Sequence, residues 1–407
     1  MKHNKGTVSP FAGDKALLAM VCILGPALVS LIPMAAVPAL PAMASHFSNS
    51  GNGQLFSQMV MTVPAISLVL FSPVAGLIVE KYGVYRCLLI SLLIYTLAGF
   101  SVLFIDDATL IIGCRLLLGV AGGGILTTCL TMIGDKFSGE AREQLLGYAT
   151  ALASLFAATA MVFGGELVDR WGWRASFALY LLGFPVLLAA WQSMTNSLVP
   201  AQRVSAQRGQ AERGHHILIP LWPYYLLLVL LTIGMFSPSI QGPFALESKG
   251  ITSATERGMI VGATSIMAFF SASAYGKLRR YLAAHTVLAI DALCMGLGLM
   301  MFALAPNSAV MVLGCAFVGI GAGMSEPAIA SIIVQKTPVQ VHGLAMGLIV
   351  SSLNAGQFTN PLAMNPLSQT FSIGTSLLVL GALLFAVGIL LTVQAKQATT
   401  HPLHPIG

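Results

Sequence analysis

Hydrophobic runs that are long enough to cross a lipid bilayer fill most of this 407-residue chain. A helix needs about 20 apolar residues to cross a hydrocarbon core of about 30 Å. Only 8% of the residues are charged, against about 25% in soluble domains, so the surface is suited to lipid and not to water. Because lipid offers no partner to an open sheet edge, the runs are expected to be helices. They are continuous and lack the alternation of a membrane β-barrel.

We predict an all-α polytopic membrane protein with twelve transmembrane helices. The first run follows basic residues, as a signal peptide does, but at about 29 residues it is longer than an ordinary signal segment. We therefore expect a retained first helix. The predicted spans are residues 16–44, 54–79, 87–105, 108–134, 145–168, 175–194, 219–246, 257–276, 284–304, 308–335, 342–366 and 372–395.

The basic residues predict the orientation in the membrane. With the N-terminus in the cytoplasm, the outer loops hold only Arg170, Arg174, Lys249 and Arg257. The inner segments hold Lys2, Lys5, Lys15, Lys81, Arg86, Lys136, Arg142, Arg203, Arg208, Arg213, Lys277, Arg279, Arg280, Lys336 and Lys396. This positive-inside bias predicts an even number of helices with both termini in the cytoplasm. It also accounts for the net charge of +6 without a nucleic-acid partner.

The chain is predicted to contain two six-helix bundles, residues 1–194 and 219–407, joined by a polar cytoplasmic linker at 195–218. A shift of 200 residues superposes glycines of the first half on glycines of the second. The superposed pairs include Gly76 with Gly276, Gly119 with Gly319, Gly123 with Gly323, and Gly147 with Gly347. An internal repeat of this length is a transporter architecture. Gly119, Gly123, Gly319 and Gly323 are expected to lie where helices pack closely.

The loop after the second predicted helix reads Gly76-x3-Glu80-Lys81-x-Gly83-x2-Arg86. Gly76 is expected to let two helices approach closely, and Gly83 to permit a tight turn. The charges of Glu80, Lys81 and Arg86 can pair across the cytoplasmic mouth and latch one conformational state.

Arg142, in the next cytoplasmic loop, is the expected partner of Glu80. The second half keeps Gly276, Arg279 and Arg280 but lacks the acidic residue, so the latch is expected to be asymmetric. An ordinary basic loop is the alternative reading.

This motif resembles the signature Gly-x3-Asp-x2-Gly-x-Arg of the major facilitator superfamily, with Glu80 in place of the aspartate. The resemblance covers essentially the whole chain. It implies two halves that rock about a site near the midplane, lined largely by helices 1, 4, 7 and 10. Gly164-Gly165 and Gly172-Trp173-Arg174 also look like the helix 5–6 region of many members.

Arg115 lies inside the fourth predicted helix, where a charge requires a wet cavity or a partner. It is expected to share one helical face with Gly119, Gly122 and Gly123. The segment resembles the Arg-x3-Gly motif of proton-coupled members, which implies a role in transport. An arginine that extends outward to the membrane interface is the alternative.

Glu326 lies in the tenth predicted helix, followed by Pro327, and a buried carboxylate there suits a proton carrier. A structural hydrogen bond is its alternative role. In the internal repeat, Glu326 aligns with Leu126, which lies about 16 Å along its helix from Arg115. A direct salt bridge between Arg115 and Glu326 is therefore not expected. Asp291, in the ninth helix, is a weaker coupling candidate, and pairing with Lys277, Arg279 or Arg280 is the competing interpretation.

Polar residues also mark three other predicted helices, where they can bind a substrate or pack helices together. These are Ser30 in helix 1, Ser237, Ser239 and Gln241 in helix 7, and Ser351, Ser352, Asn354, Gln357, Asn360 and Asn365 in helix 11. Drug–proton antiporters carry Gly-x3-Gly-Pro-x2-Gly-Gly in helix 5. This chain keeps Gly164 and Gly165 but has Phe156, Ala160 and Met161 at the earlier positions, which leaves the direction of transport open.

We therefore predict a proton-coupled secondary transporter of a small organic molecule, resembling the drug/metabolite–proton antiporter branch, with export slightly favoured. Proton-coupled uptake of an organic anion or metabolite is the first alternative. A membrane enzyme would need clustered His, Asp or Cys at a membrane face, and a sensor that has lost transport is the last alternative. No cofactor or metal is expected. The expected location is the plasma membrane, or the inner membrane of a Gram-negative cell, as a multi-pass monomer.

Overall fold

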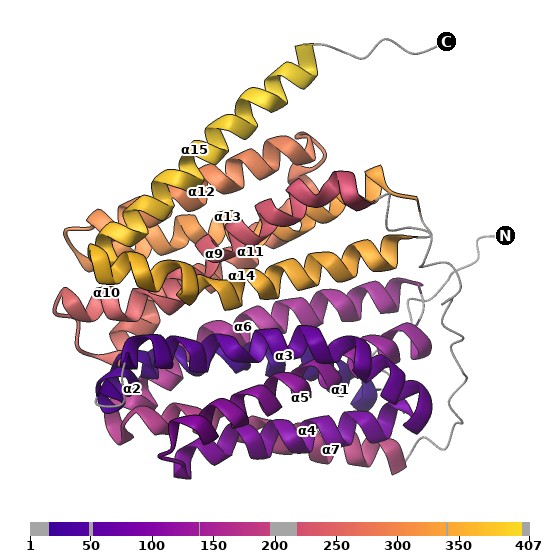
Figure 1. Cartoon of the computed structure of the whole chain (residues 1–407). Coiled ribbons are helices and arrows are strands. Elements are labelled where there is room, and N and C mark those ends of the chain that lie inside the picture. The colour runs from indigo at the N-terminus through magenta and orange to yellow at the C-terminus, as the bar shows by residue number, and fades with distance from the viewer. Residues whose placement is uncertain (1–15, 49–51, 138, 196–217, 339–340, 401–407) are drawn as a thin grey trace, which may run out of the picture. The chain divides into compact units, whose positions relative to one another are not determined.

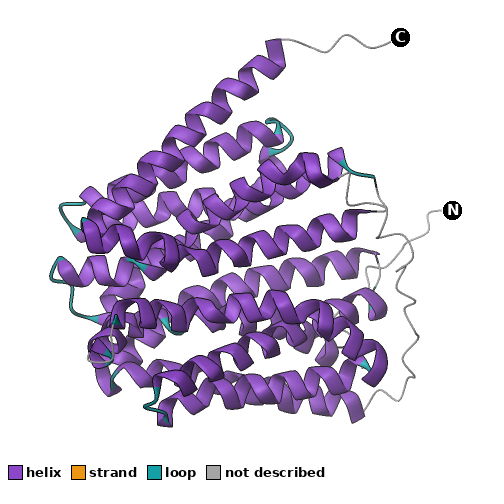
Figure 2. Cartoon of the chain, viewed as in Figure 1, coloured by secondary structure: helices purple, strands orange, loops and turns teal. Residues whose placement is uncertain are grey.

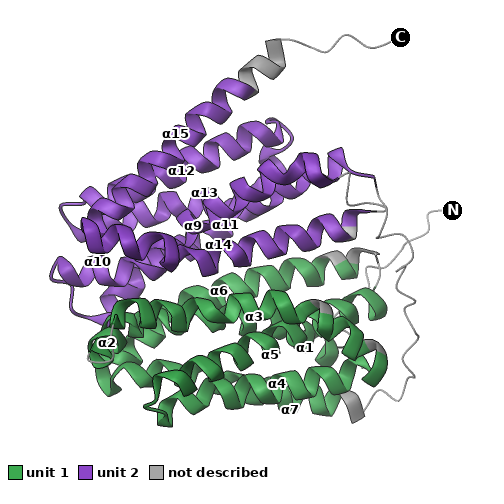
Figure 3. Ribbon diagram, in the orientation of Figure 1, with its two compact units in different colours: residues 1–205 green, residues 206–407 purple. Residues whose placement is uncertain are grey.

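The computed structural model describes residues 16–48, 52–137, 139–195, 218–338 and 341–400. Within these ranges every regular element is a helix (Figure 2). The chain divides into two compact units, Met1–Ser205 and Ala206–Gly407 (Figure 3). The division falls inside the segment that the sequence assigns to a linker, of which residues 196–217 lie outside the described ranges.

Unit 1 contains seven α-helices and three short 3₁₀ segments in its described residues (Figure 1). Several begin with a side-chain cap: Asn52 accepts a hydrogen bond from the Leu55 amide and Asp107 from the Leu110 amide. The elements are α1 (Ala16–Met34), η2 (Val37–Ala39), α2 (Leu40–His46), α3 (Gly53–Tyr82), α4 (Val84–Phe100), η4 (Ser101–Phe104), α5 (Ala108–Lys136), α6 (Gly139–Trp171), η5 (Trp173–Leu182) and α7 (Gly183–Thr195).

Unit 2 repeats this order. Asn307, at the position 200 residues after Asp107, again caps its helix by accepting from the Val310 amide. The elements are η7 (Ile219–Leu221), α9 (Trp222–Ile240), α10 (Gly242–Ser248), α11 (Ala254–Leu278), α12 (Ala284–Leu304), α13 (Ser308–Lys336), α14 (His342–Thr370) and α15 (Ile373–Thr400).

Eleven helical stretches among the described residues are long and apolar enough to cross a membrane, where the sequence predicts twelve. The remaining predicted span, 342–366, lies on α14, which at 29 residues is long enough. Its polar side chains, including Asn354, Gln357 and Asn360, make it too polar for the composition criterion. The fold is that of an all-α polytopic membrane protein, and its most polar spanning helix is the one that lies against α9.

The two units pack their helices in the same pattern. In unit 1, α5 packs on α3 and α4, while α1 packs on α6. In unit 2, α13 packs on α11 and α12, while α9 packs on α14. The repeat that the sequence indicates is therefore also a repeat of helix packing within each unit.

Glycines permit the closest of these approaches. A Cβ added at Gly119 would fall on the Pro64 carbonyl oxygen, and one added at Gly319 on the Thr264 carbonyl oxygen. The two glycines are 200 residues apart in the chain, and so are the two carbonyls that they face. Gly123 and Gly323 face the carbonyls of Leu68 and Ala268 with the same offset. Small residues at these four positions let α5 approach α3, and α13 approach α11, nearly backbone to backbone.

The first helix of each unit is interrupted near one end. Helix α1 ends at Met34 and is followed by η2 and α2, in a stretch that contains Pro33, Pro38 and Pro41. Helix α9 contains Pro238 and gives way to α10 at Gln241. Proline removes an amide hydrogen and clashes with the carbonyl four residues earlier, which accounts for both breaks.

Candidate functional site

Three ionisable residues lie well inside membrane-spanning helices: Arg115 on α5, Asp291 on α12 and Glu326 on α13. A charged group at this depth is costly unless it has a partner or faces water. The structure gives the three side chains different surroundings.

Arg115 is fully buried inside unit 1. Its Nη1 donates a hydrogen bond of 2.7 Å to the Tyr180 hydroxyl. The guanidinium carbon lies 4.8 Å from the ring centre of Phe177 and 5.3 Å from that of Tyr180. Nε and Nη2 have no hydrogen-bond partner among the described residues. Aromatic faces thus take the place of an acidic partner, since a desolvated cation–π contact is worth about 2 kcal/mol.

Arg115 is enclosed by protein in this structure, where the sequence predicts a side chain that faces a cavity, and its contacts differ from those of the glycines on the same helix. Gly119 and Gly123 face α3, whereas Gly122 faces Ile32 of α1. Arg115 itself faces η5, which carries Phe177 and Tyr180. The small residues of α5 are needed for packing on two neighbours, and the arginine is held by a third. Its role in transport stays a prediction.

Glu326 is exposed, which differs from the expected buried carboxylate. It makes no hydrogen bond and no ion pair with the described residues, so the structural bond considered as an alternative is not found. Its neighbours Ser325 and Pro327 bond elsewhere: Ser325 donates to the Gly321 carbonyl, and the Pro327 carbonyl accepts from Tyr275. A carboxylate on a membrane-spanning helix is stable at an accessible position only where water reaches it.

Asp291 is buried between α12 and α13. Neither carboxylate oxygen has a hydrogen-bond partner among the described residues. Pairing with Lys277, Arg279 or Arg280 is not found, and Arg279 instead donates to the Leu282 carbonyl. The three basic residues precede the start of α12 at Ala284, whereas Asp291 lies within that helix, which explains why the predicted pairing is not formed. Its role in coupling stays a prediction.

The predicted gate motif, Gly76 to Arg86, lies where α3 ends and α4 begins. Gly83 has φ of +88°, a backbone conformation that other residues rarely adopt, and its amide donates to the Val79 carbonyl. Lys81 and Arg86 are exposed, with the Lys81 ammonium 5.2 Å from the Tyr82 ring centre. The turn that the sequence assigns to Gly83 is thus present.

The sequence also predicts a close helix approach at Gly76 and a pairing of Glu80 with Arg142. An added Cβ at Gly76 would meet no atom within 4 Å, so the close approach predicted there is not found. Arg142 is exposed, but the side chain of Glu80 is outside the described part of the structure. Their pairing therefore stays a prediction.

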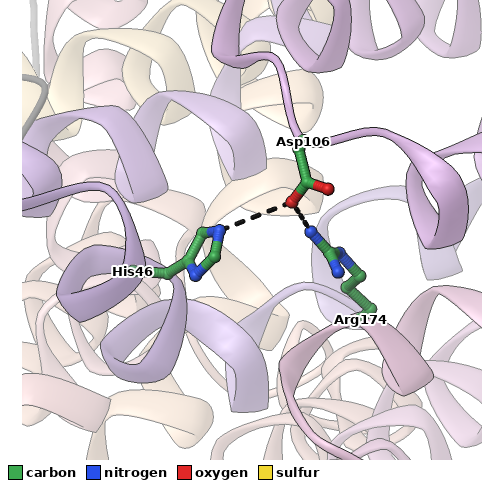
Figure 4. Close-up of polar contacts among 3 residues, drawn as sticks. All are labelled: His46, Asp106 and Arg174. Atoms are coloured by element: carbon green, nitrogen blue, oxygen red, sulfur yellow. Dashed lines mark hydrogen bonds and ion pairs between the residues drawn. The ribbon is translucent and has the colours of Figure 1, made fainter.

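A charged cluster that the sequence analysis missed lies at the other end of unit 1 (Figure 4). Asp106, in the loop before α5, accepts from Arg174 of η5 and lies 3.6 Å from Nε2 of His46 on α2. Trp173 lies against both His46 and Arg174. The sequence marks Arg174 as a basic residue of an outer loop and as part of a motif, but nothing there links it to an acid 68 residues earlier. The cluster ties the segment after the α1 break to α5 and η5.

Asn360 links α14 to the break in α9. It is fully buried, accepts a 2.8 Å hydrogen bond from Gln241 and donates to the Ile233 carbonyl at 2.7 Å and to the Ser237 hydroxyl at 3.0 Å. The polar residues of these helices can bind a substrate or pack helices together. In this structure the side chains of Ser237, Gln241 and Asn360 bond to one another and pack α9 on α14.

Replacing Asn360 with leucine is expected to destabilise unit 2 by about 1–3 kcal/mol, because Gln241 and the Ile233 carbonyl lose a buried partner. Thermal unfolding of the purified protein measures this as a fall in Tm of roughly 5 °C. Asn354→Leu is the matched control, since its amide bonds only to Val350 of its own helix. Equal Tm values for the two variants would show that the Asn360 bonds do not stabilise the unit.

Residues 22–361 of the chain match the Major Facilitator Superfamily, which is well over half of its length. The chain therefore belongs to the Major Facilitator Superfamily, and it is a transporter and not an enzyme. The resemblance seen in the gate motif is thus confirmed at the level of the family and the fold.

Two curated relatives match the chain over most of their length. A multi-drug resistance efflux pump PmrA homolog of Lactococcus lactis is 25% identical over 353 residues, covering 82% of this chain and 84% of that protein. The efflux pump PmrA of Streptococcus pneumoniae is 24% identical over 310 residues, covering 74% and 77%. Among solved structures, the nucleoside transporter NupG superposes with a TM-score of 0.73 at 12% identity, over 91% of this chain and 99% of that chain, which is a likeness of fold alone.

Proposed function

We propose that this transporter exports a small organic molecule in exchange for protons, by alternating access of its two units. The observation that carries the proposal is Glu326, an exposed carboxylate on a membrane-spanning helix that has no partner among the described residues. An ionisable side chain at such a position suits the binding and release of a proton. The relatives named as multidrug efflux pumps support export.

The proposed substrate is amphipathic and weakly charged or monoanionic. Besides Glu326, the spanning helices hold few charges in their middle parts, and Arg115 and Asp291 are enclosed within their units. Such surroundings offer apolar contact and a few polar groups, which is how sites for small organic molecules are usually built.

Proton-coupled uptake of an organic anion is the second candidate. The helix 5 positions Phe156, Ala160 and Met161 favour it, because they depart from the pattern of drug–proton antiporters. Under both interpretations we propose a monomer in the plasma membrane. The distribution of basic residues favours both termini in the cytoplasm.

Proton movement in membrane vesicles tests the proposal. Inside-out vesicles are energised and then given a panel of amphipathic cations, weak acids and neutral metabolites. An exporter discharges the pH gradient when its substrate is added, and vesicles from cells that lack the protein do not. If no compound has this effect while right-side-out vesicles acidify internally on addition of an acid, the protein is an importer and export is wrong.

A further inference from the structure

The break at the end of α1 leaves a carbonyl group without its usual backbone partner. Ala35 still donates to the Leu31 carbonyl at 2.9 Å, as in a regular helix. The next amide, at Ala36, donates instead to Pro33 at 3.2 Å and not to Ile32, four residues earlier. A buried carbonyl requires another donor, because an unpaired polar group in an apolar interior is costly.

Tyr180 supplies that donor. Its hydroxyl lies 2.7 Å from the Ile32 carbonyl oxygen and 3.4 Å from that of Leu31. The same hydroxyl accepts the 2.7 Å hydrogen bond from Nη1 of Arg115. The tyrosine is fully buried, so water does not compete for either bond. A continuous chain of hydrogen bonds thus runs from the buried guanidinium through one hydroxyl to the break in α1.

The tyrosine ring is held too tightly to adapt by moving. A Cβ added at Gly99 would lie 2.5 Å from the Tyr180 Cβ, so α4 passes directly against it. Tyr95 packs edge-on against the ring at 5.6 Å. The hydroxyl therefore has one available position, and the loss of either hydrogen bond cannot be repaired by a small rotation.

We infer that Tyr180 is a positioning residue through which Arg115 controls the break in α1. Nε and Nη2 of Arg115 lack partners among the described residues, so the bond from Nη1 is the hydrogen bond by which Arg115 acts there, and it directs the Tyr180 proton toward the Ile32 carbonyl. Without the hydrogen bond from Arg115, the O–H bond of Tyr180 is no longer held in one direction, so the Ile32 carbonyl loses its fixed donor and α1 loosens at the break. The inference rests on the proposed function only in so far as movement at this break serves alternating access.

The connection from Arg115 through Tyr180 to the helix break is confined to unit 1 among the described residues. The positions 200 residues after Arg115 and Tyr180 are Cys315 and Leu380, which cannot form this chain. The break in α9 is held instead by Asn360 of α14. Unit 2 therefore provides an internal reference for any measurement on the break in unit 1.

Tyr95 provides a matched control. Its hydroxyl also donates to a carbonyl of α1, that of Leu28, at 2.7 Å, and it is equally buried. It has no hydrogen bond to Arg115. Tyr95→Phe and Tyr180→Phe thus each remove a hydroxyl that donates to a carbonyl of α1. Only Tyr180→Phe cuts the connection between Arg115 and the break.

Amide hydrogen exchange of the intact protein in nanodiscs tests the inference without a substrate. In Tyr180→Phe, exchange in residues 33–40 should rise about tenfold, as expected for the loss of a buried hydrogen bond. Arg115→Met should raise it in the same segment by about threefold, and the double variant should exchange no faster than Tyr180→Phe. Tyr95→Phe should remain within about twofold of wild type there, and residues 237–243 should be unchanged in all variants.

Two results would overturn the inference: an Arg115→Met variant with normal exchange at the break, or Tyr95→Phe matching Tyr180→Phe. Because Arg115→Met and Tyr180→Phe are read separately, failure of one to fold leaves the other decisive. In transport assays, Tyr180→Phe should lower the maximal rate about tenfold with KM nearly unchanged, and Tyr95→Phe should not. If wild type transports nothing, the proposed function fails while the exchange data still decide the inference.

Discussion

Leucine in place of Gly119 or Gly319 is expected to prevent the protein from folding. At both positions the first added carbon would fall on a backbone carbonyl of the neighbouring helix, which no rotation of a side chain can relieve. The helices α3 and α5, or α11 and α13, would have to separate along their closest contact. We expect a loss of at least about 3 kcal/mol, at the upper end for overpacked interiors. The measurement is the yield of monodisperse protein in size-exclusion chromatography.

Gly113→Leu is the control for this prediction. It introduces the same side chain on the same helix α5, at a position where an added Cβ would meet no atom within 4 Å. The second half carries Leu313 at the corresponding position, so leucine is compatible with this place in the repeat. If Gly119→Leu and Gly113→Leu both gave the wild-type yield of monodisperse protein, the close approach of α3 and α5 would not be required for folding.

Glu326→Gln is expected to abolish proton-coupled transport and to leave the fold intact. The amide has the shape of the carboxyl group but cannot take up or release a proton, and no hydrogen bond or ion pair with a described residue is lost. Uphill movement of substrate should fall to the background of vesicles that lack the protein. Exchange of labelled for unlabelled substrate at equilibrium should continue, because it requires no net proton movement.

Glu166→Gln is the matched control for Glu326→Gln. It makes the same chemical change near the end of α6, where it removes an exposed ion pair with Arg170 that is worth less than about 1 kcal/mol. Coupled transport in Glu326→Gln at the level of Glu166→Gln would remove Glu326 from the proton pathway.

The fold could be predicted from the sequence because lipid imposes strong constraints on it. The long apolar runs report a requirement that the bilayer places on any spanning helix, and the 200-residue repeat reports the similar order of helices in the two units. The exception is α14, which lies at its predicted position but is more polar than the other spans. Asn360 explains part of that polarity, since it bonds to α9 and not to lipid.

The surroundings of the candidate site residues could not be predicted in the same way. Helical periodicity places Arg115 near the glycines of α5, but its partner Tyr180 lies 65 residues away in the chain. The same limit applies to Asp106 and Arg174, and to the exposure of Glu326. Sequence spacing gives the depth of a charge within a helix, whereas its direction depends on which helices pack around it.

The central claim is that a proton gradient drives transport by this protein, and purified protein in liposomes tests it most directly. The liposomes carry an internal pH dye and an imposed pH gradient, without ATP, and receive a compound that is active in vesicles. The account predicts that substrate addition moves protons in wild type, that collapse of the gradient with an ionophore stops uphill transport, and that Glu326→Gln shows neither effect. Substrate movement that is equally fast with the gradient collapsed would contradict it.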